Sequence, residues 1–157
     1  MKMITLCVIS ALLCASAFAR IGETEDEIRA RYGKPVNEDR AQPPIVERGY
    51  LTSGMIVVVM FIDGKSEAEM FMKAKNFDQL SDEEVQLLLK ANSNGKEWTD
   101  APTGALISFD QVWRIPDLDR TAQFSKLERK LIVCSGKYLA AQKAQKEAET
   151  AAKLKSF

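Results

Sequence analysis

The strongest constraint on the fold is the unbroken apolar segment MIVVVMFI at Met55–Ile62. Most of its residues are β-branched or aromatic, which favours a β-strand. Because successive strand residues point to opposite faces, a run without polar residues places apolar side chains on both of them. The segment therefore predicts a strand inside a sheet that is covered on both faces. At an exposed edge it would be a template for aggregation.

Two short turns place further strands beside this segment. Asp63-Gly64 is typical of a two-residue hairpin turn, and it returns the chain as a strand over Lys65–Lys73. Ser53-Gly54 marks a second turn, which follows a strand over residues 46–52. We therefore predict three antiparallel strands with Met55–Ile62 in the middle.

A capping box begins a short helix near the start of the chain. The Thr24 side chain can accept from the backbone N–H of Glu27, whose side chain reaches back to the Thr24 N–H. Gly33 suits the left-handed conformation that ends a helix, so we predict a two-turn helix over Glu25–Tyr32. The polar stretch Asn37–Pro44 then predicts an extended arm that leads to the first strand.

The second half of the chain repeats this order of a capped helix followed by antiparallel strands. A second capping box at Ser81–Glu84 begins a helix that ends within Asn92–Gly95. Strands are predicted at Ala105–Ile115, Thr121–Lys126 and Lys130–Cys134, with a turn at Pro116–Asp119.

From about Lys137 onward the chain is rich in Ala, Lys, Glu and Gln, which favours a helix with a thin apolar stripe. We predict a helix over 137–157 that is docked at its start and increasingly exposed. The predicted fold class is thus α+β: an antiparallel sheet built from two helix-then-strands units, plus an exposed C-terminal helix. The sheet and its helices form a single domain over 20–136.

The first 19 residues have the layout of a secretory signal peptide. A short basic start is followed by the apolar stretch Ile4–Ala15 and by small residues in Ala17-Phe18-Ala19. We expect cleavage after Ala19, a periplasmic or secreted protein, and no stable membrane insertion after cleavage. Leucines precede Cys7 and Cys14, so a lipid anchor is not expected. The alternative for this segment is a buried N-terminal helix.

Composition narrows the possible chemistry. The chain has no histidine, which excludes Ser-His-Asp and Cys-His catalysis and the common zinc sites. Its 22 basic and 22 acidic side chains are not segregated, so we expect no nucleic-acid partner. No catalytic constellation, phosphate-binding loop or metal-ligand cluster is present in the sequence, so we expect no enzyme activity, no cofactor and no metal.

Two tryptophans are the candidate contact residues. Trp98 and Trp113, with nearby aromatic residues, are of the type that line a platform for a sugar ring or a peptide. The alternative is that both rings pack in the core or at its edge. The other aromatic residues considered with them are Tyr32, Tyr50 and Phe109.

Three further groups have both a functional and a structural interpretation. Cys134 follows apolar residues and is expected to be a small core residue rather than a reactive thiol. Asp117 and Asp119 suit a turn better than a calcium site or a carboxylate pair, because further oxygen ligands are lacking. Methionines in the first sheet are expected to fill the core rather than to form a pliable surface: Met55, Met60, Met70 and Met72.

Residues 21–73 resemble the opening of the BamE/SmpA-like and β-lactamase-inhibitor-like exported proteins. The pattern consists of Gly22, Thr24, Ile28, Gly33 and Pro35, followed by Phe61, Asp63, Gly64 and Lys65. BamE-like members are typically lipoproteins with a two-helix opening, whereas this chain has no lipobox and one short helix before its sheet.

The resemblance implies a non-catalytic role in the cell envelope. We therefore expect an exported protein- or envelope-binding or assembly module, whose partner is an envelope or secreted protein. The alternative is a carbohydrate- or peptidoglycan-binding domain that uses exposed Trp98 or Trp113. A carboxylate-dependent hydrolase is disfavoured because no acid–base pair is discernible.

Overall fold

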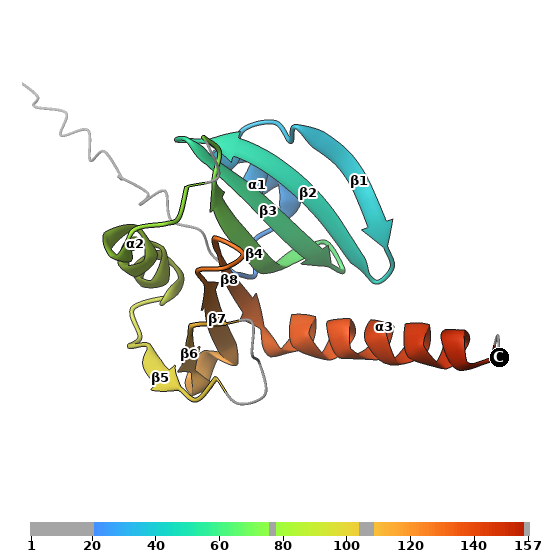
Figure 1. Cartoon of the computed structure of the whole chain (residues 1–157). Coiled ribbons are helices and arrows are strands. Elements are labelled where there is room, and N and C mark those ends of the chain that lie inside the picture. The colour runs from blue at the N-terminus through green and yellow to red at the C-terminus, as the bar shows by residue number, and fades with distance from the viewer. Residues whose placement is uncertain (1–20, 76–77, 104–108, 156–157) are drawn as a thin grey trace, which may run out of the picture.

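The computed structural model describes residues 21–75, 78–103 and 109–155, and the predicted signal peptide with its cleavage site lies outside this range. Within it, eight strands form one antiparallel sheet in the order β1-β2-β3-β4-β8-β7-β6-β5 (Figure 1). The helices are α1 (Glu25–Tyr32), α2 (Asp82–Asn92) and α3 (Gly136–Leu154), with a 3₁₀ turn η1 (Pro116–Leu118). The strands are β1 (Asn37–Gln42), β2 (Ile45–Thr52), β3 (Met55–Ile62), β4 (Lys65–Lys73), β5 (Thr99–Ala101), β6 (Gln111–Ile115), β7 (Arg120–Ser125) and β8 (Lys130–Ser135).

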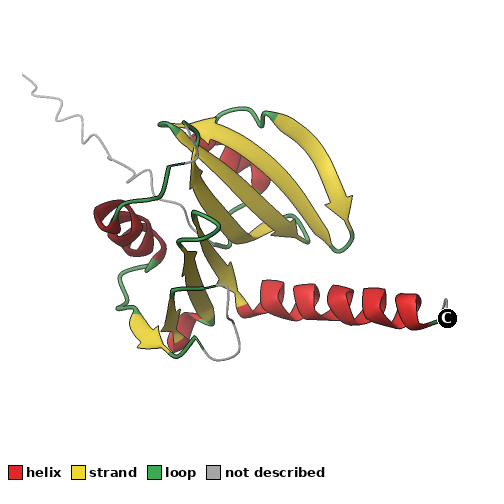
Figure 2. Cartoon of the chain, in the orientation of Figure 1, coloured by secondary structure: helices red, strands yellow, loops and turns green. Residues whose placement is uncertain are grey.

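The α+β fold predicted from the sequence is confirmed. Each half of the chain is a helix followed by four antiparallel strands, and the last strands of the two halves, β4 and β8, pair with each other in the middle of the sheet (Figure 2). In this ladder Ala68 faces Cys134 and Phe71 faces Leu131. The two halves therefore share one continuous sheet.

Both predicted capping boxes are present. Thr24 accepts from the backbone N–H of Glu27, and Ser81 accepts from that of Glu84, while each glutamate accepts from the N–H of its cap residue. The first helix spans Glu25–Tyr32, as predicted. These local hydrogen bonds satisfy backbone donors that the first helical turn leaves free, so both helices begin at the expected residue.

The predicted hairpins around β3 are also confirmed. Ser53 and Gly54 have φ of 49° and 75°, and Asp63 and Gly64 have φ of 53° and 72°. Positive φ at both central residues is the geometry of a type I′ turn, whose twist matches that of paired strands. The turns fix the register in which β3 lies between β2 and β4.

The two faces of β3 are covered to different degrees. Val57 and Val59 are buried in the larger core, to which α1 contributes Ile28 and α2 contributes Val85 and Leu89. On the opposite face the far end of β3 is buried with Tyr138 of α3, whereas Ile56 and Val58 are only half-buried. The prediction that the strand is covered on both faces is therefore wrong for its first half.

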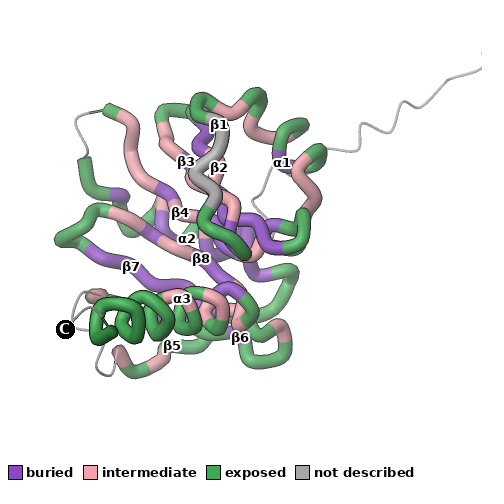
Figure 3. Tube along the Cα trace, turned by 90° about the vertical axis from the view of Figure 1, so that its right-hand side faces the viewer, coloured by how far each residue is buried: buried purple, intermediate pink, exposed green. Residues whose placement is uncertain are grey.

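The reason is the short docked part of α3. Tyr138 lies in the first turn of α3 and is the buried residue of this helix. Most residues after it are exposed (Figure 3). Gln145 still donates to the backbone carbonyl of Gln42, at 2.8 Å, and beyond it the helix projects from the sheet. The predicted helix that is docked at its start is confirmed, and its docked part covers only one end of this face.

Three strand predictions need correction. The expected arm over Asn37–Pro44 is the edge strand β1, since Asn37 Oδ1 accepts from the Gly49 N–H at 2.7 Å and starts the pairing with β2. The strand predicted at Ala105–Ile115 begins only at Gln111, because Asp110 bends the chain and accepts from the Lys126 N–H; residues 104–108 are outside the described range. The edge strand β5, with three polar or small residues, has no apolar pattern and was not predicted.

Candidate functional site

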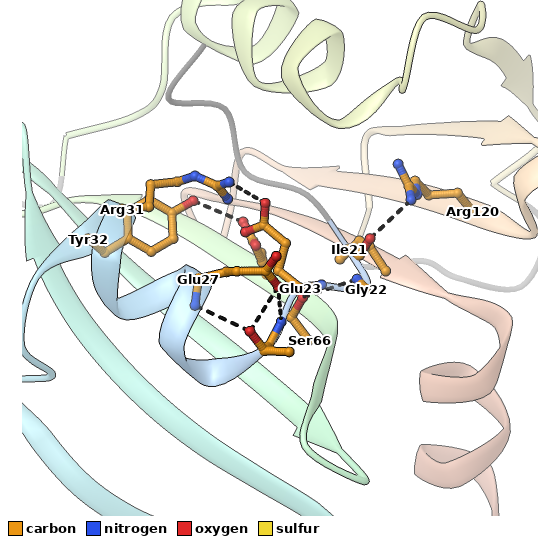
Figure 4. Close-up of polar contacts among 10 residues, drawn as sticks. Ile21, Gly22, Glu23, Glu27, Arg31, Tyr32, Ser66 and Arg120 are labelled. Atoms are coloured by element: carbon orange, nitrogen blue, oxygen red, sulfur yellow. Dashed lines mark hydrogen bonds and ion pairs between the residues drawn. The ribbon is translucent and has the colours of Figure 1, made fainter. Parts of the chain in front are cut away.

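The segment before α1 is held against the start of β4. The Gly22 N–H donates to the Ser66 carbonyl at 2.7 Å, and the Ser66 N–H donates to the Glu23 carbonyl at 2.8 Å. The Ser66 hydroxyl also accepts from both the Gly22 and the Glu23 N–H. These bonds place the Glu23 side chain at the junction of α1 and the sheet (Figure 4).

A buried carboxylate on β4 lies at the centre of this junction. Glu69 is fully buried, and its Oε2 accepts from the Tyr32 hydroxyl of α1 at 3.0 Å. The next residue of α1 toward the N-terminus, Arg31, forms an ion pair with Glu23 and lies over the Tyr32 ring. Burial raises the pKa of Glu69 to about 7, although the Tyr32 hydrogen bond and Arg31 oppose the rise.

An arginine from the second half of the chain completes the cluster. Arg120 of β7 donates to the backbone carbonyl of Asn92 at the end of α2 and to that of Ile21, the latter at 3.4 Å. Figure 4 shows Arg120 reaching Ile21 from the side opposite Arg31. Burial lowers the pKa of Arg120, and the charge of Glu69 opposes this shift. We call Glu23, Arg31, Tyr32, Glu69, Asn92 and Arg120 the junction cluster.

The junction cluster is incompletely hydrogen-bonded. Among the described residues, five buried side-chain polar atoms have no hydrogen-bond partner, and all five belong to this cluster. They are Glu23 Oε2, Arg31 Nη1, Glu69 Oε1, Asn92 Oδ1 and Arg120 Nε. An unpaired buried polar atom usually costs on the order of 1–3 kcal/mol, so this concentration makes the junction cluster a candidate functional site.

A groove of about 250 Å³ lies next to the cluster, between α1 and α2. Its lining is mainly apolar, and two members of the junction cluster, Arg31 and Tyr32, belong to it. Leu87 of α2, also in the lining, is 59% exposed. The other lining residues are Thr52, Ser53, Met55, Val57, Phe71, Leu88 and Ala91. A concave apolar surface with a few polar groups is the usual form of a binding site. We call it the α1–α2 groove.

The two tryptophans suggested by the sequence lie away from this groove's lining. Trp113 is 7% exposed and belongs to the larger core, against which the half-buried Trp98 packs. The indole N–H of Trp98 donates to the Leu89 carbonyl at 2.7 Å. The structure thus brings both rings to one core rather than to an exposed platform. Of the other aromatic residues considered, Tyr50 is buried, and its ring lies 5.7 Å from that of Tyr32.

The other residues considered from the sequence, a cysteine, two aspartates and the methionines, lie in the core, in a turn or in the groove lining. Cys134 is fully buried, and burial raises the pKa of its thiol to about 12, as expected for a core residue. Asp119 has φ of 46° and ends the η1 turn, and Asp117 forms an ion pair with Lys96 at 3.5 Å. Among the methionines Met60 is fully packed, while Met55 lines the groove.

The described ranges contain no cluster of acidic or thiol side chains suited to hold a metal ion. In the same ranges no helix has the length and apolar character needed to cross a membrane. The junction cluster supplies one carboxyl group of raised pKa and two arginines. The carboxyl group can hold or release a proton, and the arginines can bind carbonyl or carboxylate oxygens.

Sequence reasoning missed Glu69, Arg31 and Arg120. A signal for Glu69 was present, because strand alternation puts it on the same face as Phe71, next to the most apolar strand of the sheet. An ionisable residue at such a position is expected to be buried and paired. Its approach to Arg120 depends on the pairing of β4, β8 and β7 and has no local signal.

No family model matches the chain, and no curated protein matches it. A cysteine-rich secretory protein from Staphylococcus aureus has a similar solved structure, with a TM-score of 0.51 and 7% sequence identity. The match covers 76% of this chain and 46% of that protein, so this chain spans less than half the length of its structural neighbour. At this identity the likeness concerns the fold alone.

Proposed function

We propose that this protein is an exported, non-catalytic binding or assembly module whose partner is an envelope or secreted protein. The observation that carries the proposal is the α1–α2 groove, with its apolar lining and the exposed Leu87 among its residues. A concave, mainly apolar surface with a few polar groups is the form that binding pockets usually take. The resemblance of residues 21–73 to BamE/SmpA-like and β-lactamase-inhibitor-like proteins points to the same class.

The groove suits an apolar anchor from a partner protein. Its volume of about 250 Å³ is enough for one or two apolar side chains. The side chains of Arg31 and Tyr32 form one wall of the groove, where their ion pair with Glu23 and hydrogen bond to Glu69 hold them in place. Burial of such anchors in a pocket supplies most of the energy in many protein interfaces.

Site-specific photo-crosslinking in bacterial cells that export this protein tests the proposal. A photoreactive residue in place of Leu87 is expected to give discrete protein adducts. The matched control is Leu127, which is 86% exposed in the β7–β8 turn, far along the chain from the groove lining. Equal adduct patterns at both positions, or none at either, contradict the proposal.

Two further readouts separate the parts of the proposal. Intact-mass measurement of exported protein is expected to show a chain that begins at Arg20, and retention of residues 1–19 contradicts the export route. Binding to isolated peptidoglycan that is lost when Trp98 is replaced by alanine would favour the carbohydrate-binding alternative instead.

A further inference from the structure

Glu69 is the group in the junction cluster whose charge is hardest to accommodate. It is fully buried in the sheet, Oε2 accepts one hydrogen bond from Tyr32, and Oε1 accepts none from any described residue. A buried carboxylate normally needs several donors to offset the loss of hydration. With one donor, the protonated acid fits the observed arrangement better than the ion.

The groups that face Glu69 come from every element packed around it. Tyr32 and Arg31 belong to α1, Glu23 to the segment before α1, and Arg120 to β7. Arg31 and Arg120 favour an ionised Glu69, whereas burial and the charge of Glu23 oppose it. The two arginines already bind other oxygens: Arg31 binds Glu23, and Arg120 binds two backbone carbonyls.

Each arginine also has one buried N–H without a partner. These are Nη1 of Arg31 and Nε of Arg120. An ionised Glu69 carries a free acceptor, and its charge attracts both arginines, because charge-assisted hydrogen bonds are about twice as strong as neutral ones. Arg120 donates from its other two nitrogens to the carbonyls of Ile21 and Asn92, which ties the N-terminal segment and the end of α2 to β7.

We propose that Glu69 is a proton-controlled contact between α1 and the sheet: when protonated it keeps its hydrogen bond with Tyr32 and leaves the neighbouring ion pair of Arg31 and Glu23 in place, and when it ionises its buried charge, which faces that of Glu23, loosens the segment before α1 from β4. The proposal concerns the junction cluster alone and stands whether or not the α1–α2 groove binds a partner.

The expected direction with pH follows from the proton affinity. The pKa of Glu69 is about 7 in the folded chain against an ordinary value of 4.5, so the folded state holds the proton more tightly than the unfolded state. The resulting stabilisation is complete below about pH 4.5 and is lost as the pH rises through about 7. The junction is therefore tightest in mildly acidic conditions.

Amide hydrogen exchange between pH 5 and pH 8, corrected for the intrinsic pH dependence of exchange, tests the proposal. We expect protection of the Gly22 and Ser66 amides to fall by about tenfold or more across this range. In Glu69→Gln, which keeps the shape and cannot ionise, protection at these amides should be independent of pH. Glu67→Gln is the matched control, because Glu67 lies on the same strand but pairs with Ser135 and Lys137.

Two outcomes of the exchange experiment would overturn the proposal. A parent protein without pH-dependent protection, or a Glu69→Gln variant with the same pH dependence as the parent, overturns the proposal. Should Glu69→Gln fail to fold, carbon-13 NMR of the parent supplies a second measurement. A Glu69 carboxyl midpoint of about 6 or above supports the proposal, and a lower midpoint overturns it.

Discussion

The two faces of the sheet are built from similar residues but are covered differently. On the face toward α1 and α2, Val57 is 2% exposed and Val59 is fully buried. On the face toward α3, their neighbours Ile56 and Val58 are half-buried, and Leu51 beside them is 57% exposed. An unbroken apolar sequence therefore indicates a strand inside a sheet, but it does not indicate whether a helix covers each face of that strand.

The less covered area forms a continuous patch across four neighbouring strands. Strand register places Ile56 between Leu51 and Met72, and Val58 next to Met70, which in turn faces Ile132. We call these six apolar side chains the open patch: Leu51, Ile56, Val58, Met70, Met72 and Ile132. It adjoins the part of the same face that Tyr138 buries.

The largest effect is expected from a charge placed on each face of β3 in turn. Val57→Asp buries an unpaired carboxylate and should cost about 3 kcal/mol or more, a large part of the roughly 5–15 kcal/mol that stabilises an ordinary domain. Val58→Asp should cost less than half as much, since its carboxylate can reach water from the open patch. Urea and thermal melts of the two variants measure the difference. Equal losses would mean that both faces are covered in solution.

A loss of stability similar to or somewhat below that of Val57→Asp is expected where α3 covers the sheet. Tyr138→Ala removes the side chain that buries this end of the sheet and should cost about 2–4 kcal/mol. It should also speed alkylation of Cys134, which is buried beneath the same cluster and should resist labelling in the folded parent. Leu154→Ala, on the exposed part of the same helix, is the control. Rapid labelling of the native parent would contradict this account.

The smallest change in the free energy of unfolding is expected for a substitution at the rim of the open patch. Leu51→Thr exchanges one β-strand residue for another at an exposed position, so its effect on the free energy of unfolding should lie within about 0.5 kcal/mol. Chemical denaturation measures it against Val46→Thr, a half-buried position of the same strand that packs on the larger core. A loss above about 1 kcal/mol at Leu51 would show that something covers the patch in solution.

Much of the first half of the fold could be predicted because its signals are local. The capping box at Thr24 and the turns at Ser53-Gly54 and Asp63-Gly64 act within a few residues, and they set α1, β3 and β4 to the residue. The edge strands β1 and β5 escaped prediction because a polar strand at a sheet edge has no apolar alternation. Their existence depends on pairing with a neighbour.

The site was much less predictable than the fold. Trp98 and Trp113 were chosen by residue type, but type alone does not separate a core ring from an exposed one. Glu69 and Arg120 influence each other's charge only because β4, β8 and β7 lie side by side, which is a property of the finished sheet. Hydrogen bonds and charges across distant segments carry no periodic pattern in the sequence.

The pairing of β4 with β8 has a consequence for the order of folding. Every other ladder in the described sheet joins strands that are consecutive in the chain, so each half can assemble through short loops. The β4–β8 ladder joins the two ends of these halves, and closing the long intervening chain carries the greatest entropic cost. We expect this closure to limit the folding rate. Because Glu69 lies in that ladder as well as against β3 and α1, we expect the burial of its carboxyl group to be completed only when the two halves join.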